Sequence, residues 1–81
     1  MKKKNIKTYN KDGYNHGYWE TYHLNGQLWY KGYYVNGKSH GYWERYHYDG
    51  KILYKGYFKD SKKDGYWEDY FFDNNEIQIY I

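Results

Sequence analysis

The sequence has no cysteine, no proline and no alanine among its 81 residues. Without cysteine the chain can form neither a disulfide nor a thiolate metal site, and such usage fits a reducing compartment. No apolar run approaches the ~20 residues that a membrane span needs. The lysines at positions 2–4 are followed by polar residues, which is not the pattern of a signal peptide. These absences predict a cytoplasmic protein with no membrane span.

Aromatic side chains supply most of the apolar content. The chain has 15 Tyr, 4 Trp and 3 Phe, and its net charge is only +3. Tyr, Trp and Phe favour pleated strands, and each can bury roughly 150–250 Å². The composition therefore predicts an all-β fold in which columns of aromatic rings replace an aliphatic core. The mild net charge does not predict a long basic stripe.

A repeat of 24 residues organises the chain. The tetrapeptide Gly-Tyr-Trp-Glu begins at residues 17, 41 and 65, and residues 17–40 match residues 41–64 at 12 of 24 positions. We interpret the chain as one domain, with a partial copy at 1–16 and repeats at 17–40, 41–64 and 65–81. In the partial copy, Tyr9 and His16 fall on the columns of Tyr33 and His40. Such a period indicates stacked supersecondary units.

Each repeat reads as one β-hairpin. Asn25-Gly26 and Asp49-Gly50 are strong signals for a type I′ turn, which needs positive φ at both central residues. The links between hairpins are also short and polar, so sequential strands should form an antiparallel meander. The glycines that punctuate this pattern are Gly17, Gly26, Gly41, Gly50 and Gly65. We expect seven strands, at about 4–10, 17–24, 27–34, 41–48, 51–58, 65–72 and 76–81.

The segment from Tyr30 to Gly50 resembles the MORN repeat, whose pattern is Tyr-x-Gly-x-aromatic, then Asn-Gly-Lys-x-His-Gly, then an aromatic strand ending in Asp-Gly or Asn-Gly. Trp43 stands where the family usually has its second glycine. This departure and the 24-residue period resemble the antitoxin branch of the bacterial MORN-like proteins. The resemblance implies an elongated, twisted single sheet, contact with protein or lipid, and no catalysis. The matching residues are Tyr30, Gly32, Tyr34, Gly37, Lys38, His40, Gly41 and Gly50.

Neither face of the predicted sheet is cleanly polar. Strict alternation places Trp29 with Lys31 and Tyr33, whereas a soluble antiparallel sheet usually has one polar face. One explanation is a bulge after each Trp that brings Trp and Tyr to the same side. The other is an aromatic face exposed for a partner, since Trp, Tyr and Arg are the residues most often energetic at interfaces. Candidate partner-binding residues are Trp19, Trp29, Trp43, Trp67, Arg45, Tyr33 and Tyr57.

The C-terminal strand is a second candidate surface. Ile77, Ile79 and Ile81 alternate along a β-prone segment that has no Pro or Lys to blunt a sheet edge. Such an edge can pair with another copy of the chain or with a partner's strand, or it can simply cap the sheet.

The residue pattern favours binding over chemistry. The His and Glu residues recur at the repeat period, so they spread along the sheet instead of converging on a metal or a catalytic cleft. We therefore expect no enzyme activity, no metal and no cofactor. The primary hypothesis is a module that binds and blocks a larger protein, such as a toxin or a bacterial defence or effector protein. Its gene would then belong to a bacterium, or to a phage or virus acting in the host cytoplasm. The alternative is nucleic-acid or lipid-headgroup binding through a basic and aromatic face.

Overall fold

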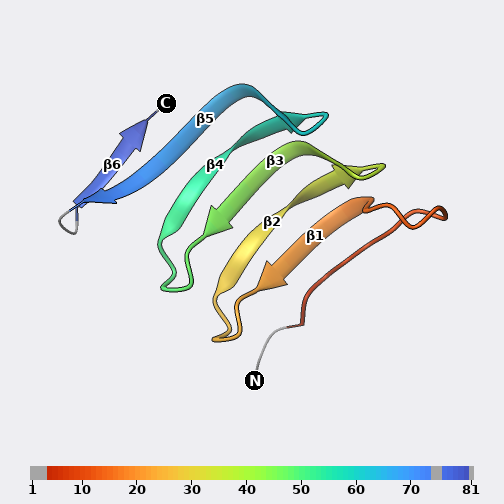
Figure 1. Cartoon of the computed structure of the whole chain (residues 1–81), viewed down its shortest axis with the longest axis horizontal. Helices are drawn as coiled ribbons and strands as arrows, with labels where there is room; N and C mark the ends of the chain where they lie inside the picture. Colours follow the sequence, from red (N-terminus) through yellow and green to blue (C-terminus); the bar gives the residue numbers. More distant parts are fainter. Residues whose placement is uncertain (1–3, 74–75, 81) are drawn as a thin grey trace.

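The computed structural model describes residues 4–73 and 76–80, with side chains through residue 70. Within these residues six strands follow one another in one antiparallel sheet, and each pairs with the next along the chain (Figure 1). The predicted all-β meander of hairpins is confirmed. The strands are β1 Gly17–Tyr22, β2 Leu28–Val35, β3 Lys38–Tyr46, β4 Ile52–Lys59, β5 Lys62–Asp73 and β6 Glu76–Tyr80.

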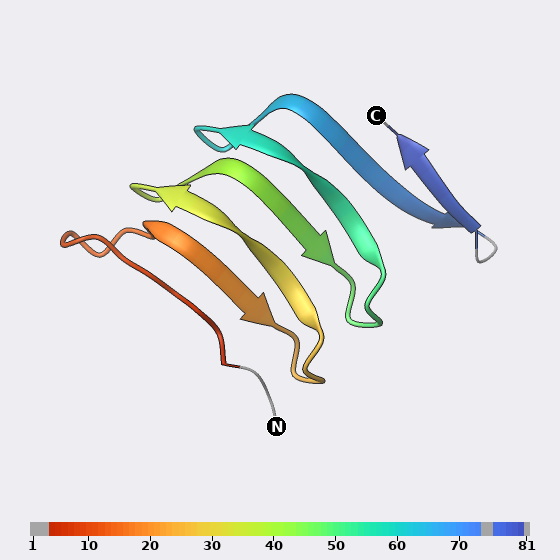
Figure 2. The ribbon, with the colours of Figure 1, turned by 180° about the vertical axis from the view of Figure 1, so that it is seen from behind.

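The sheet is a single layer. Its principal extents are 46 × 36 × 11 Å, and the two opposite views show a twisted sheet with no second layer on either side (Figure 1 and Figure 2). The described part of the chain therefore has no enclosed core between two layers. What burial it achieves comes from side chains that lie flat along the sheet.

The paired positive φ predicted for Asn25-Gly26 and Asp49-Gly50 is found at the links between hairpins instead. Positive φ at two successive residues occurs at the links, with 48° and 87° at Asn36-Gly37 and 51° and 65° at Asp60-Ser61. At Asn25-Gly26 and Asp49-Gly50 only the glycine has positive φ. There the Asn25 side chain accepts a hydrogen bond from the backbone of Gln27, which is typical of a longer loop built on a type I turn. The hairpins are where we expected them, but their turn chemistry differs.

The predicted strand over residues 4–10 is wrong, because this segment does not form a regular strand. This segment runs beside β1, but it makes only two isolated bridges, Ile6 with Glu20 and Tyr9 with Asn15. Its register also differs by one residue from the prediction. The backbone carbonyl of Thr8 accepts a hydrogen bond from the backbone N–H of His16. In the next repeat Tyr33 faces His40, so Thr8 takes the place of Tyr33. Tyr9 therefore occupies the column of Tyr34, because the loop before His16 is one residue longer.

The repeated Trp forms the buried apolar core of the sheet. Trp19, Trp43 and Trp67 are 5%, 4% and 8% exposed. The indole of Trp43 lies flat on Gly32 of the preceding strand, where a Cβ would overlap the ring. Trp67 lies in the same way on Gly56, where a Cβ would be 2.6 Å from Cδ2 of the indole. These two indoles thus use the space that a missing side chain leaves.

A hydrogen bond fixes each of these indoles. The Nε1–H group of Trp43 donates to the carbonyl of Tyr33 at 3.0 Å, and that of Trp67 donates to the carbonyl of Tyr57 at 2.6 Å. Trp19 donates to the carbonyl of Thr8 at 2.8 Å. In each case the accepting carbonyl belongs to the residue that follows the one beneath the ring. Buried indole N–H groups need such a partner, so the bond selects one orientation of the ring.

Candidate functional site

The register shifts in four of the strand pairs, and two of these β-bulges have an extra residue that changes its side. Between Thr21 and Tyr22 the pairing partner moves from Tyr30 to Leu28, so Trp29 is left unpaired in β2. The same shift occurs between Arg45 and Tyr46, where β4 has the extra residue. The bulge brings Trp29 to the side of Tyr30, contrary to strict alternation. We call that side the aromatic face: Trp19, Trp29, Tyr30, Tyr34, Trp43, Arg45, Tyr54, Phe58 and Trp67.

The opposite side, which we call the carboxylate face, repeats a Tyr-Glu-Tyr ladder. In β3 the hydroxyls of Tyr42 and Tyr46 each donate to Glu44 at 2.7 Å. Lys31 of β2 adds an ion pair to Glu44, with 3.5 Å between Nζ and Oε1. The same phenol-to-carboxylate pairing occurs around Glu20 and Glu68. This face also contains Tyr33 and Tyr57, which pack against Tyr18 and Tyr42.

These contacts shift the protonation of the ladder. Burial and the hydrogen bond to Glu44 raise the pKa of Tyr46 to about 12, and the same two causes raise the pKa of Tyr42. Burial works to raise the pKa of Glu44, but its hydrogen bonds from Tyr42 and Tyr46 and the charge of Lys31 outweigh burial and lower that pKa. Near neutral pH, ionised carboxylates and neutral phenols therefore hold each other in place along each strand.

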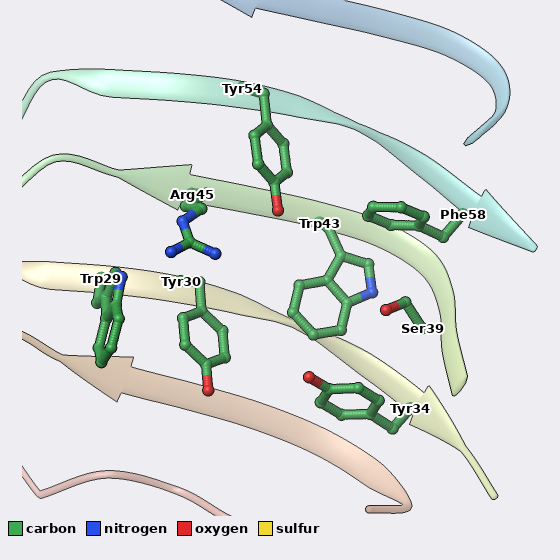
Figure 3. Close-up of a pocket in the computed structure, with 8 residues that line it drawn as sticks. All are labelled: Trp29, Tyr30, Tyr34, Ser39, Trp43, Arg45, Tyr54 and Phe58. Carbon is green, nitrogen blue, oxygen red and sulfur yellow. The ribbon is translucent and has the colours of Figure 1, made fainter. Parts of the chain in front are cut away.

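The aromatic face contains a hollow of about 350 Å³ over β2, β3 and β4 (Figure 3). Six rings line it, and Arg45 and Ser39 of β3 add polar groups. In Figure 3 the guanidinium of Arg45 extends from β3 toward Trp29 and Tyr30, and the ring of Tyr54 points inward from β4. The hollow thus combines apolar ring surface with one cation. Its rings are those of Trp29, Tyr30, Tyr34, Trp43, Tyr54 and Phe58.

The rings of the hollow brace one another. Tyr34 meets Trp43 edge to face with 4.9 Å between ring centroids, and Tyr30 stacks on Trp43 at 5.9 Å. Burial raises the pKa of the Tyr34 hydroxyl, which keeps it neutral. Trp29 stacks on His23 at 5.2 Å between centroids. Such aromatic pairs hold the walls of the hollow in place without closing it.

The candidate partner-binding residues are divided between three places. Trp19, Trp43 and Trp67 are buried on glycine or in ring contacts, so they form the sheet and offer little surface. Trp29, at 38% exposed, and the half-buried Arg45 lie together on the aromatic face. Tyr33 and Tyr57 are exposed on the carboxylate face. The sequence pattern does not predict Tyr30, Tyr34, Tyr54 and Phe58 as binding residues. The only signal for them is that positions 30 and 54, and positions 34 and 58, are aromatic in both repeats.

The remaining predicted residues are the five glycines and the C-terminal edge. Gly26 and Gly50 lie in turns as predicted, whereas Gly17, Gly41 and Gly65 lie within β1, β3 and β5. Each glycine named as punctuation has positive φ, from 78° to 99°. Ile77 and Ile79 belong to β6, which is the last strand in the sheet order. Ile81 lies outside the described residues. Whether this edge pairs with a second copy stays a prediction.

Neither a cluster of metal-ligating side chains nor a long apolar helix is found in the described residues. No group of three or more His, Cys, Asp or Glu side chains is placed to hold a metal ion there. No helix in that part of the chain is long and apolar enough to cross a membrane. Comparison of the chain with known protein families, with curated proteins and with solved structures gives no match. The function is therefore inferred from the chain's own residues.

Proposed function

We propose that this chain is a non-catalytic protein-binding module that docks on a larger protein and blocks or neutralises it. The observation that carries the proposal is the uncovered aromatic face, in which Trp29 and Arg45 lie beside a hollow of about 350 Å³. Trp, Tyr and Arg next to a concave apolar surface are the composition of energetic hot spots in protein interfaces. The target would be a toxin, or a bacterial defence or effector protein.

The resemblance to the antitoxin branch of MORN-like proteins supports the same proposal. In that setting a small sheet would act by covering the working surface of its target. A phage- or virus-encoded inhibitor of a bacterial defence protein would use the same mode of action. The sheet's longest extents of 46 and 36 Å give one face ample area, since a standard interface needs about 800 Å² from each partner.

A second candidate function is binding of nucleic acid or lipid headgroups. Its support is that Lys7, Arg45 and Lys63 each lie over an indole ring, at 5.8, 5.8 and 4.6 Å from the ring centroid. Two observations favour a protein partner instead. Lys63 is already paired with Asp69 at 3.2 Å. The indoles beneath Lys7 and Lys63 are buried, so they offer no open platform on which a base could stack.

Affinity capture from the native host with mass spectrometry tests the proposal. Wild-type chain should retain one protein at high salt, and Trp29→Ala and Arg45→Ala should each lose it. Leu24→Ala is the matched control, because Leu24 is 90% exposed in a loop and should retain the protein. Binding that disappears with a steep dependence on salt would instead support the nucleic-acid alternative. If no protein is retained above background, the proposal fails.

A further inference from the structure

Arg45 occupies a position that is positively charged only in the central repeat. It pairs across the sheet with Tyr30 on one side and Tyr54 on the other. The equivalent residues in the neighbouring repeats are Thr21 and Asp69. The repeat scaffold itself therefore does not need a cation here, because a buried threonine and an aspartate also fit the column.

The guanidinium of Arg45 has no carboxylate within 4.0 Å among residues 4–70. Two lysines of the neighbouring strands do have such partners. Lys31 of β2 pairs with Glu44 of β3, and Lys55 of β4 pairs with Glu68 of β5. Arg45 is held instead against the ring of Trp29, with 5.8 Å between its Cζ atom and the ring centroid. A guanidinium that lies over an aromatic ring keeps the N–H groups at its edge available to bind an anion.

The surroundings of Arg45 suit one kind of ligand. Apolar rings around a charge lower the local polarity and strengthen its attraction to an opposite charge. The volume of about 350 Å³ is within the usual range for ligand sites and exceeds what one carboxylate needs. The extra space is bounded by Tyr34, Trp43 and Phe58, so it suits an apolar group beside the anion.

We propose that the hollow around Arg45 is the docking site for an Asp or Glu side chain of the partner protein, together with an adjacent apolar side chain. The guanidinium donates two parallel hydrogen bonds to the carboxylate, and the apolar neighbour packs against Trp43 and Phe58. This inference rests on the proposed function and adds the chemistry of the contact. A protein carboxylate fits better than a nucleic acid, whose successive phosphates need several free cations, whereas Lys63 is already paired with Asp69.

Synthetic peptides provide the test. The probe is a capped peptide with Glu between Leu and Phe, and its counterpart has Gln in place of Glu. Binding is followed by NMR shifts of the Arg45 Nε–H and Trp29 Nε1–H groups. We expect the Glu peptide to bind at least about tenfold tighter than the Gln peptide, because a charge-assisted pair is about twice as strong as a neutral one.

Three variants sharpen this test. Arg45→Gln should abolish the preference for Glu, and Arg45→Lys should retain part of it, since lysine keeps the charge but not the two-pronged geometry. Lys63→Gln is the matched control, because it removes one positive charge from the same face and should leave the preference intact. Each variant is first checked for native dispersion of its NMR spectrum, so that loss of binding reports on the hollow.

Several outcomes would overturn the inference. These are equal binding of the two peptides, no shift with either, tighter binding of a thymidine oligonucleotide, or the same shifts with inorganic phosphate alone. The proposed function has a separate readout. If the host protein is captured equally well by wild type and by Arg45→Gln, the module binds a protein but not through this site. If no host protein is captured although the Glu peptide binds, the hollow is real and the proposed function is wrong.

Discussion

Trp43 and Trp19 occupy the same place in successive repeats, yet the backbone beneath them differs. Trp43 lies on Gly32 within a continuous strand. Trp19 has Lys7 at the corresponding position, with the lysine Nζ 5.8 Å from the ring centroid, and the segment around Lys7 makes only isolated bridges. The difference teaches that the glycine lets an indole and an unbroken strand occupy the same layer. Where a side chain replaces it, the strand gives way.

The two regions also differ on the carboxylate face. Glu44 has two phenols and Lys31, whereas Glu20 has two phenols and the backbone of Ile6 across from it. The central repeat thus has both a glycine beneath its indole and an ion pair, and the described N-terminal segment has neither at the corresponding positions. Substitutions in the two regions can separate how much each difference contributes to the free energy of unfolding.

The largest effect on stability should come from adding a side chain at Gly32, beneath the Trp43 indole. Gly32→Ala should lower the free energy of unfolding by about 3 kcal/mol, because its Cβ would overlap the Trp43 indole and either the strand or the ring must move. Gly32 does not have positive φ, so the effect reports the overlap and not backbone strain. Lys7→Ala at the corresponding position should change stability little. Urea unfolding of both variants checks this, and equal effects would remove the distinction between the regions.

Shortening the indole should be the next largest effect. Trp43→Phe should cost about 2 kcal/mol, because it loses packing volume and leaves the Tyr33 carbonyl without its donor. Trp19→Phe should cost less, since the neighbouring segment is already irregular and can relax around the smaller ring. Thermal unfolding monitored by circular dichroism orders the two variants. A larger loss at Trp19 would contradict the expected order.

The carboxylate ladder should make stability depend on pH at both ends. The lowered pKa of Glu44 means that its stabilisation is present above the unfolded value of about 4.3 and is lost as pH falls below it. The raised pKa of Tyr46 means that its stabilisation is present below about pH 10 and is lost as pH rises toward about 12. Glu44→Gln should cost about 1–2 kcal/mol at neutral pH and flatten both limbs. Unfolding midpoints across pH measure this, and an unchanged profile in the variant would refute it.

The smallest effect should come from the ion pair. Lys31→Ile copies the N-terminal arrangement into the central repeat, and it should cost under about 1 kcal/mol because Lys31 is 38% exposed on its side chain and solvent screens the pair. The reverse change, Ile6→Lys, should gain no more than that. Chemical denaturation at low and high salt provides the check. A cost of several kcal/mol would mean that the ion pair, and not the phenols, holds Glu44.

The sequence predicted much of this fold and less of the site. The repeat of Gly-Tyr-Trp-Glu and the turn pairs indicated the order and pairing of the hairpins. They did not place the turn types, because Asp60-Ser61 adopts the paired positive φ that Asn25-Gly26 was expected to have. Strict alternation also misplaced Trp29. A bulge was one of the two explanations for the mixed faces, but a period of two does not locate it beside Leu28 and Trp29. Only the place of Trp29 depends on that bulge. Tyr30 and Tyr54 pair with Arg45 directly, so grouping them required the cross-strand register, which the repeat pattern does not specify.

Hydrogen exchange of the four indole Nε1–H groups tests the central claim most directly, namely that the repeated Trp builds the sheet and Trp29 is available to a partner. We expect strong protection for Trp43 and Trp67, whose Nε1–H groups donate to backbone carbonyls, and weaker protection for Trp19. Trp29 should exchange at nearly the rate of a free indole. Fast exchange at Trp43, or protection of Trp29 equal to that of Trp43 in the isolated chain, would contradict this claim.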